Sequence, residues 1–165
     1  MTVLATLDLL ARWGHLLGVI VWMGHNFANV VQSPRYTPVE PGAQAEARFS
    51  AAMRREHGTF RYASVVVLLT GAYMLWYQGI LAETLLLQQP FHILGIGVWL
   101  GLLMVANLWL VLWPHQKTVL GYVEAPDEER IRCSRITFLS SRTNTILAFP
   151  TVLFMAAGAH GLPWM

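Results

Sequence analysis

The sequence has little charge and almost no cysteine. Of its 165 residues, only 12% are charged, whereas 55% are hydrophobic. The single cysteine, Cys133, excludes an internal disulfide and any CxxC metal site, and without a CxxCH motif the chain cannot attach a c-type haem covalently. It also has no P-loop, GxSxG, HExxH or dinucleotide glycine fingerprint. These absences leave no recognisable soluble-enzyme site.

Long apolar runs make up most of the chain instead. Four long stretches carry no Asp, Glu, Lys or Arg. A bilayer core about 30 Å thick needs about 20 apolar residues in a helix, and each stretch is long enough. The first stretch has no basic segment before it and no small-residue cleavage site, so we do not expect a cleavable signal peptide. The predicted transmembrane helices are 9–31, 60–81, 91–113 and 143–160.

Basic residues gather in two of the predicted loops. Of eleven Lys and Arg, five lie between the first two spans and five between the last two, and the N-terminal segment has only Arg12. The positive-inside rule places both loops in the cytoplasm and both termini in the periplasm. We therefore predict one domain over residues 1–165, an all-α membrane protein folded as an up-down four-transmembrane-helix bundle. Its surroundings would be the lipid bilayer of the bacterial inner membrane, and no nucleic-acid partner is expected despite a pI near 9.0.

Local signals refine this outline. The first basic loop is expected to contain a short surface helix from about Ala43, and the third span is expected to break at Pro114. The run "APDEER" at 125–130 is typical of a helix start, and this helix would continue into the fourth span.

Small and polar residues inside the spans predict contacts between helices. GxxxG spacing lets helix backbones approach closely, and buried amides favour interhelical hydrogen bonds. Whether the bundle also associates into a homo-oligomer stays open. The glycine pairs are Gly14 with Gly18 and Gly97 with Gly101, and the amides are Asn29, Asn107 and Asn144.

Six histidines separate into two predicted depths. Three of them fall toward the outer side and three toward the inner side. Ionisable residues within a bilayer are costly and are functional by default. Within the first span His15 and His25 share one face with Trp22, about 15 Å apart along the helix, which favours two stacked sites over one. The outer histidines are His15, His92 and His160, and the inner ones are His25, His57 and His115.

Paired imidazoles from different helices in a tryptophan-rich bundle favour haem b, with one or two molecules per chain. Arg142, at the inner end of the fourth span, would pair with a haem propionate or serve as a positive-inside anchor. Copper transport, which would use methionines beside the histidines, is the alternative with a metal. A non-catalytic membrane anchor, whose histidines only bond between helices, also stays open. The axial-ligand candidates are His15, His92, His160 and His57, and the other candidate haem contacts are His25, Trp22, Trp99 and Arg142.

Four runs, one in each predicted span, resemble the bacterial membrane-bound urate hydroxylase family. They are "WGHLLGVIVWMG", "FRYASVVVLLTG", "MVANLWLVLWPHQK" and "SSRTNTILAFPTVLFMAAGAH". The resemblance implies a haem-associated membrane oxidoreductase, and longer members of the family carry more spans and a C-terminal cytochrome c domain. The expected function is electron transfer between a membrane or periplasmic donor and acceptor, with a c-type cytochrome or a quinone as partner. Whether this chain is itself an enzyme, and whether urate is involved, stays open.

Overall fold

The computed structural model describes residues 3–55 and 58–160, and within these ranges every regular element is a helix. Seven are α-helices and one, labelled η1, is a π-helix. The elements are α1 (Val3–Gln32), α2 (Ala43–Arg55), α3 (Thr59–Tyr77), α4 (Leu81–Leu85), α5 (His92–Ala106), η1 (Asn107–Leu112), α6 (Trp113–Val119) and α7 (Asp127–His160).

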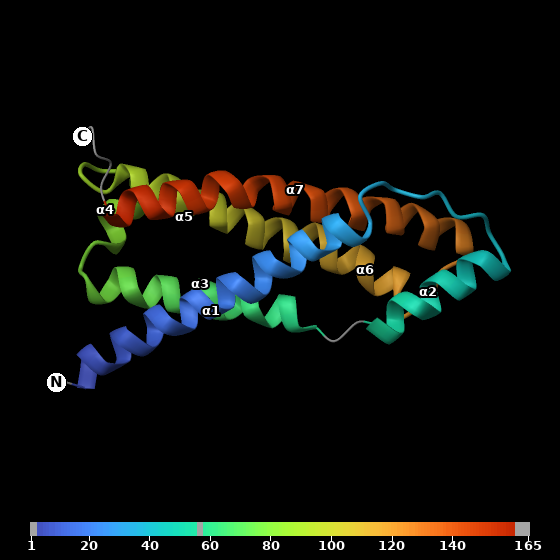
Figure 1. The fold of residues 1–165 in the computed structure, drawn as a ribbon, viewed down its shortest axis with the longest axis horizontal. Coiled ribbons are helices and arrows are strands. Elements are labelled where there is room, and N and C mark those ends of the chain that lie inside the picture. Colours follow the sequence, from blue (N-terminus) through green and yellow to red (C-terminus); the bar gives the residue numbers. More distant parts are fainter. Residues whose placement is uncertain (1–2, 56–57, 161–165) are drawn as a thin grey trace.

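The helices make four lengthwise passes that alternate in direction (Figure 1). α1 is the first pass and α3 the second, α5, η1 and α6 together form the third, and α7 is the fourth. α1 begins and α7 ends at the end of the molecule where α4 lies, which we call the α4 end. α2 lies at the opposite end, the α2 end.

Three helices in the described part of the chain are long and apolar enough to cross a membrane: Val3–Gln32, Thr59–Tyr77 and His92–Val119. They support the prediction of a membrane protein. The second half of α7 was predicted as the fourth span but does not belong to this set. It contains Asn144 and Thr151, both buried, which lower its apolar character. The fourth span and the periplasmic termini stay predictions.

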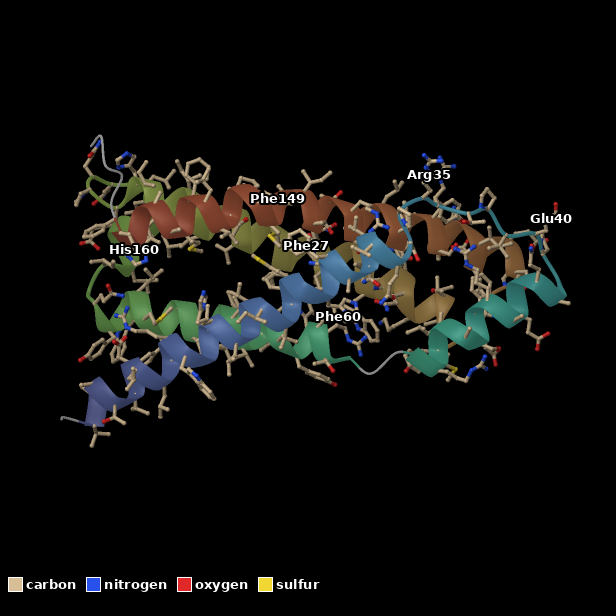
Figure 2. The ribbon with its side chains drawn as sticks, viewed as in Figure 1. Phe27, Arg35, Glu40, Phe60, Phe149 and His160 are labelled. Atoms are coloured by element: carbon tan, nitrogen blue, oxygen red, sulfur yellow. The ribbon has the colours of Figure 1, made fainter. Side chains whose placement is uncertain are left out.

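The four passes pack as two pairs. α1 lies along α3 and α5 lies along α7, and the two pairs meet mainly where α1 crosses α7. Figure 2 shows Phe27 of α1 beside Phe149 of α7, whose rings contact edge to face with centroids 5.3 Å apart. The apolar core at this crossing draws residues from all four passes: Trp22, Met23, Phe60, Ala63, Met104, Leu108, Leu112 and Ala148.

One glycine of each predicted GxxxG pair sits at a close helix contact. A Cβ on Gly18 would lie 2.7 Å from Val67 Cγ2 of α3, and a Cβ on Gly97 would lie 2.9 Å from the backbone nitrogen of Met155 in α7. The other glycine of each pair has ordinary van der Waals space. Gly18 and Gly97 therefore allow each helix pair to approach closely.

Side-chain amides link α5 and η1 to α7. Asn107 Nδ2 donates to the backbone oxygen of Ser140 at 2.9 Å and to Asn144 Oδ1 at 2.8 Å. Asn144 Nδ2 donates to the backbone oxygen of Met104 at 3.1 Å, and Ser140 Oγ donates to Asn107 Oδ1 at 3.0 Å. The predicted interhelical hydrogen bonds of Asn107 and Asn144 are confirmed.

The predicted break at Pro114 is wrong, because the helix continues through the proline into α6. Proline lacks an N–H, and its ring collides with the carbonyl four residues earlier in a regular α-helix. Here the wider π-turn of η1 comes immediately before it, and the Trp113 N–H donates to the Leu108 oxygen five residues back. Trp109 Nε1 also donates to Ser64 Oγ of α3 at 3.2 Å, which anchors η1 to the other helix pair.

A second apolar cluster forms at the α2 end. The predicted surface helix is present as α2, and its Ala45 and Phe49 pack with Val119 and Cys133. α7 begins at Asp127, as the sequence indicated, and runs unbroken to His160. Its first half therefore extends the bundle beyond the predicted fourth span and forms one wall of a cavity.

Candidate functional site

A cavity of about 780 Å³ lies at the α2 end, and its size is within the usual range for ligand sites. Its walls come from the end of α1, the loop that follows, and parts of α2, α6 and α7. We call it the arginine cavity. The polar residues that define it are His25, Asn26, Arg35, Arg48, Ser141 and Arg142.

The arginine cavity carries positive charge only. The charged residues of its described lining are three arginines, and none is Asp or Glu. Guanidinium groups stay charged at any physiological pH. A concave surface with one sign of charge concentrates ions of the opposite sign. The cavity is therefore suited to an anionic group.

Arg142 of α7 holds the end of α1. Its Nη2 donates to the backbone oxygens of Asn29, at 3.3 Å, and Ser33. The guanidinium carbon also lies 4.4 Å from the centroid of the Phe138 ring. The last carbonyls of a helix have no partner within the helix, so a cation from a neighbouring helix satisfies them well. Arg142 thus fixes one wall of the cavity, a structural task beyond the predicted anchoring.

The loop after α1 is fastened on both sides. Arg48 Nη1 of α2 donates to the Thr37 backbone oxygen at 2.6 Å. The hydroxyl of Tyr36 lies 3.0 Å from Ser134 Oγ of α7, and either group can be the donor. These bonds fix the loop between α2 and α7, so the cavity keeps a defined wall where the chain has no regular secondary structure.

Buried polar atoms of Asn26 and Ser141 at the cavity have no hydrogen-bond partner among the described residues. Asn26 lines the cavity with 3% of its surface exposed, and its Nδ2 is unpartnered. Ser141 Oγ is also buried and has no hydrogen-bond partner among the described residues. A buried polar group left unsatisfied costs about 1–3 kcal/mol. A ligand that accepts hydrogen bonds would remove that cost.

His25, the inner histidine of α1, lines the arginine cavity and stacks on Phe60 of α3. The two rings lie 4.4 Å apart with an interplanar angle of 8°. Nearby, the Arg61 guanidinium lies 3.5 Å from the centroid of the Trp113 ring, a cation–π contact between α3 and α6. The His25–Phe60 stack forms part of the cavity wall next to the bundle core.

His15 lies nearer the α4 end and is held by α3. Its Nδ1 is 3.0 Å from the Val67 backbone oxygen and 3.2 Å from Thr70 Oγ1. A carbonyl only accepts, and the Thr70 hydroxyl donates to the Val66 oxygen at 2.6 Å, so Nδ1 carries the proton and donates. The lone pair of the neutral ring is then on Nε2. A Cβ on Gly71 would lie 3.1 Å from His15 Cε1, so this glycine leaves room for the ring.

The remaining histidines have different settings. His92 is the first residue of α5, and its buried Nδ1 has no partner among the described residues. His160 is the exposed last residue of α7, at the α4 end (Figure 2). His115 Nδ1 donates to the Val111 oxygen of its own helix at 2.6 Å. His57 lies outside the described residues.

The structure does not gather the three outer histidines into one metal-binding group. Within residues 3–55 and 58–160, no three His, Cys, Asp or Glu side chains are placed to hold a metal ion together. Of the two tryptophans proposed to contact haem, Trp22 is buried in the core. Trp99 is 47% exposed and donates to the Leu85 backbone oxygen at 3.0 Å, so it lies on the outside of the bundle.

Sequence reasoning missed Asn26, Arg35 and Arg48 as site residues. Asn26 follows Trp22 by one helical turn, and this spacing could have placed it on the interior face of α1. Arg48 and Arg35 gave no such signal, because an arginine on a surface helix or loop looks the same whether it faces water or a cavity.

Within residues 3–55 and 58–160 every regular element is a helix, and three of these helices are long and apolar enough to cross a membrane, which supports a membrane protein as the class of this chain. Comparison with family models, with curated proteins and with solved structures found no match to it. The resemblance to membrane-bound urate hydroxylases stays a prediction.

Proposed function

We propose that the chain is an inner-membrane cytochrome that binds haem b through His15 and His92 and passes electrons between a membrane or periplasmic donor and acceptor. The observation that carries this proposal is the 3.0 Å contact between His15 Nδ1 and the Val67 backbone oxygen. Because Nδ1 donates to the Val67 oxygen, the lone pair lies on Nε2, the atom that would bind iron. Metal-binding histidines are commonly oriented by this kind of bond from the other ring nitrogen.

His92 fits the role of second ligand. Its Nδ1 is buried and has no hydrogen-bond partner among the described residues, so its ring retains unsatisfied bonding capacity. It begins α5 at the α4 end, in the helix pair opposite His15. Haem, when bound, supplies an iron that cycles between the ferric and ferrous states. The chain would hold that iron by one imidazole from each pair.

The placement in the membrane belongs to the same proposal. The second half of α7 packs along α5, and we assign it as the fourth span. Its polar residues Asn144 and Thr151 donate to the backbone oxygen and the sulfur of Met104 in α5. The two basic loops would face the cytoplasm. His15 and His92 would then lie toward the periplasm, within reach of a c-type cytochrome or a quinone.

The test is the optical spectrum of the full chain, purified in detergent, and of three histidine variants. His15→Gln and His92→Gln should lose haem or shift it from low spin to high spin, because no iron ligand replaces the imidazole. His115→Gln is the matched control and should keep the parent spectrum, since that ring bonds to its own helix. Unchanged spectra for both His15→Gln and His92→Gln would refute the assignment. Thermal unfolding of each variant shows whether a loss of haem is only a loss of fold.

A further inference from the structure

We propose that the arginine cavity binds a phosphate oxyanion, either as the head group of an anionic phospholipid or as free phosphate. This site is separate from the proposed haem ligands, which lie nearer the α4 end. It does not depend on haem binding.

The charge of the cavity lining favours an anionic ligand. Arg48 of α2 and Arg142 of α7 line one cavity without an acidic residue among its described lining. Like charges gathered in this way repel one another unless an anion lies between them. Guanidinium groups bind phosphate through paired N–H donors, in which geometry adds to charge.

Arg142 and Arg48 also keep N–H donors that a ligand can use. The bonds of Arg142 to the carbonyls at the end of α1 use one terminal nitrogen, and so does the bond of Arg48 to Thr37. A guanidinium has five N–H donors, so each arginine keeps others for a ligand. The same bonds hold the guanidinium groups in place before a ligand arrives, which lowers the entropy cost of binding.

Two uncharged side chains at the cavity can also donate hydrogen bonds to a ligand. Asn26 Nδ2 is a donor only, and it is buried at the cavity without a partner. Ser141 Oγ, also unpartnered, can donate as well. A phosphate diester only accepts hydrogen bonds, so it matches both the charge and the donors of the cavity. A cationic ligand would match neither.

The cavity lies at the end of the bundle that carries both basic loops, which the positive-inside rule places at the cytoplasmic surface. Anionic lipid head groups lie at this surface, and basic pockets between membrane helices bind them. Soluble phosphate is present on the same side, so the experiment must separate the two sources.

The experiment measures thermal unfolding of the full chain in a neutral detergent. Three additions are compared: phosphatidylglycerol, phosphatidylcholine and inorganic phosphate. A ligand that binds only the folded state raises the unfolding temperature as its concentration rises. We expect phosphatidylglycerol to raise it and phosphatidylcholine, whose phosphate is balanced by its own choline, to have little effect. A rise with inorganic phosphate at millimolar concentration would identify the free anion as a source, and no rise with either anion overturns the proposal.

Variants make the test specific to the cavity. Arg48→Gln should weaken the anion response about tenfold or more, because hydrogen bonds to charged groups are the strong ones. Arg54→Gln, an exposed residue of α2 outside the cavity, is the matched control and should respond like the parent.

Asn26→Leu guards against a variant that merely fails to fold. It removes the unpartnered amide, so the protein without ligand should unfold at an equal or higher temperature while its anion response falls. An undiminished anion response in both Asn26→Leu and Arg48→Gln overturns the proposal. So does a loss of haem from these variants with the anion response intact, because the cavity would then hold haem propionates.

Discussion

Asn107 and Asn144 show how polar side chains act inside an apolar helix pair. Each amide forms hydrogen bonds through both its oxygen and its nitrogen, so neither atom is left unsatisfied. These directional bonds restrict how α7 can pack against α5 and η1. Because the partners include backbone oxygens of Ser140 and Met104, the bonds also fix the register between the helices.

Replacing Asn107 by leucine should therefore destabilise the bundle. The change leaves Asn144 Oδ1 and Ser140 Oγ without their partner inside the protein, at an expected cost of about 2 kcal/mol. Denaturant unfolding in mixed micelles measures it. Thr143→Ala, an exposed position on α7, is the control and should change stability by no more than about 0.5 kcal/mol. Equal stabilities of the two variants would show that the amide network contributes nothing.

Single residues also show how much of a site can be predicted from the sequence. Asn107 and Asn144 could be predicted as interhelical partners, because amides in apolar runs need partners. The sequence predicts a membrane depth for each histidine, but it does not predict the groups that the ring contacts. His15 bonds to α3 and His25 stacks on Phe60, and these contacts depend on how α1 crosses α3.

Among the elements, the α1–α3 pair depends most clearly on one small residue. Gly18 faces Val67 closely enough that a methyl group could not fit without movement. Gly24, six residues later on α1, has nothing within 4 Å of a Cβ position. Alanine variants at the two glycines therefore separate two effects on stability, that of the helix–helix contact and that of helix propensity.

Gly18→Ala should destabilise the protein by about 1–3 kcal/mol, because the methyl group forces α1 and α3 apart. Gly24→Ala should leave stability unchanged or raise it by about 0.5–1 kcal/mol, since alanine is the better helix former. Thermal unfolding of both variants checks the difference. A stable Gly18→Ala protein would mean that α1 and α3 do not pack as closely as described.

The starts of α2 and α7 could be predicted from local signals. Acidic residues mark the start of α7, and the end of the proline-rich stretch marks the start of α2. The π-helix before Pro114 could not be predicted, because its six residues are as apolar as the α-helix they interrupt. Whether a helix breaks at a proline depends on whether the turn before it is an α-turn or a wider π-turn. The spacing of apolar residues does not distinguish these two turns.

At the scale of the molecule, the alternating passes place the start of α1 and the end of α7 together (Figure 1). The basic loops lie at the other end, around the arginine cavity. If α7 is the fourth span, the molecule has a cationic cytoplasmic end and a periplasmic end near His15 and His92.

Alkaline phosphatase fusions test this orientation. A fusion after Met165 or at Gly79 should be active, because both positions would be periplasmic, whereas a fusion at Gly42 should be inactive. Activity at Gly42 with none after Met165 would invert the membrane placement, and the arginine cavity would then face the periplasm.

The central claim is that the folded chain holds haem b. The most direct measurement is the pyridine haemochrome spectrum of the full chain, purified in mild detergent from cells supplied with haem precursor, with protein quantified on the same sample. The account predicts the spectrum of non-covalent haem b at about one haem per chain, removable by acid acetone because no CxxCH motif binds it covalently. A folded, monodisperse protein without porphyrin absorption would contradict it.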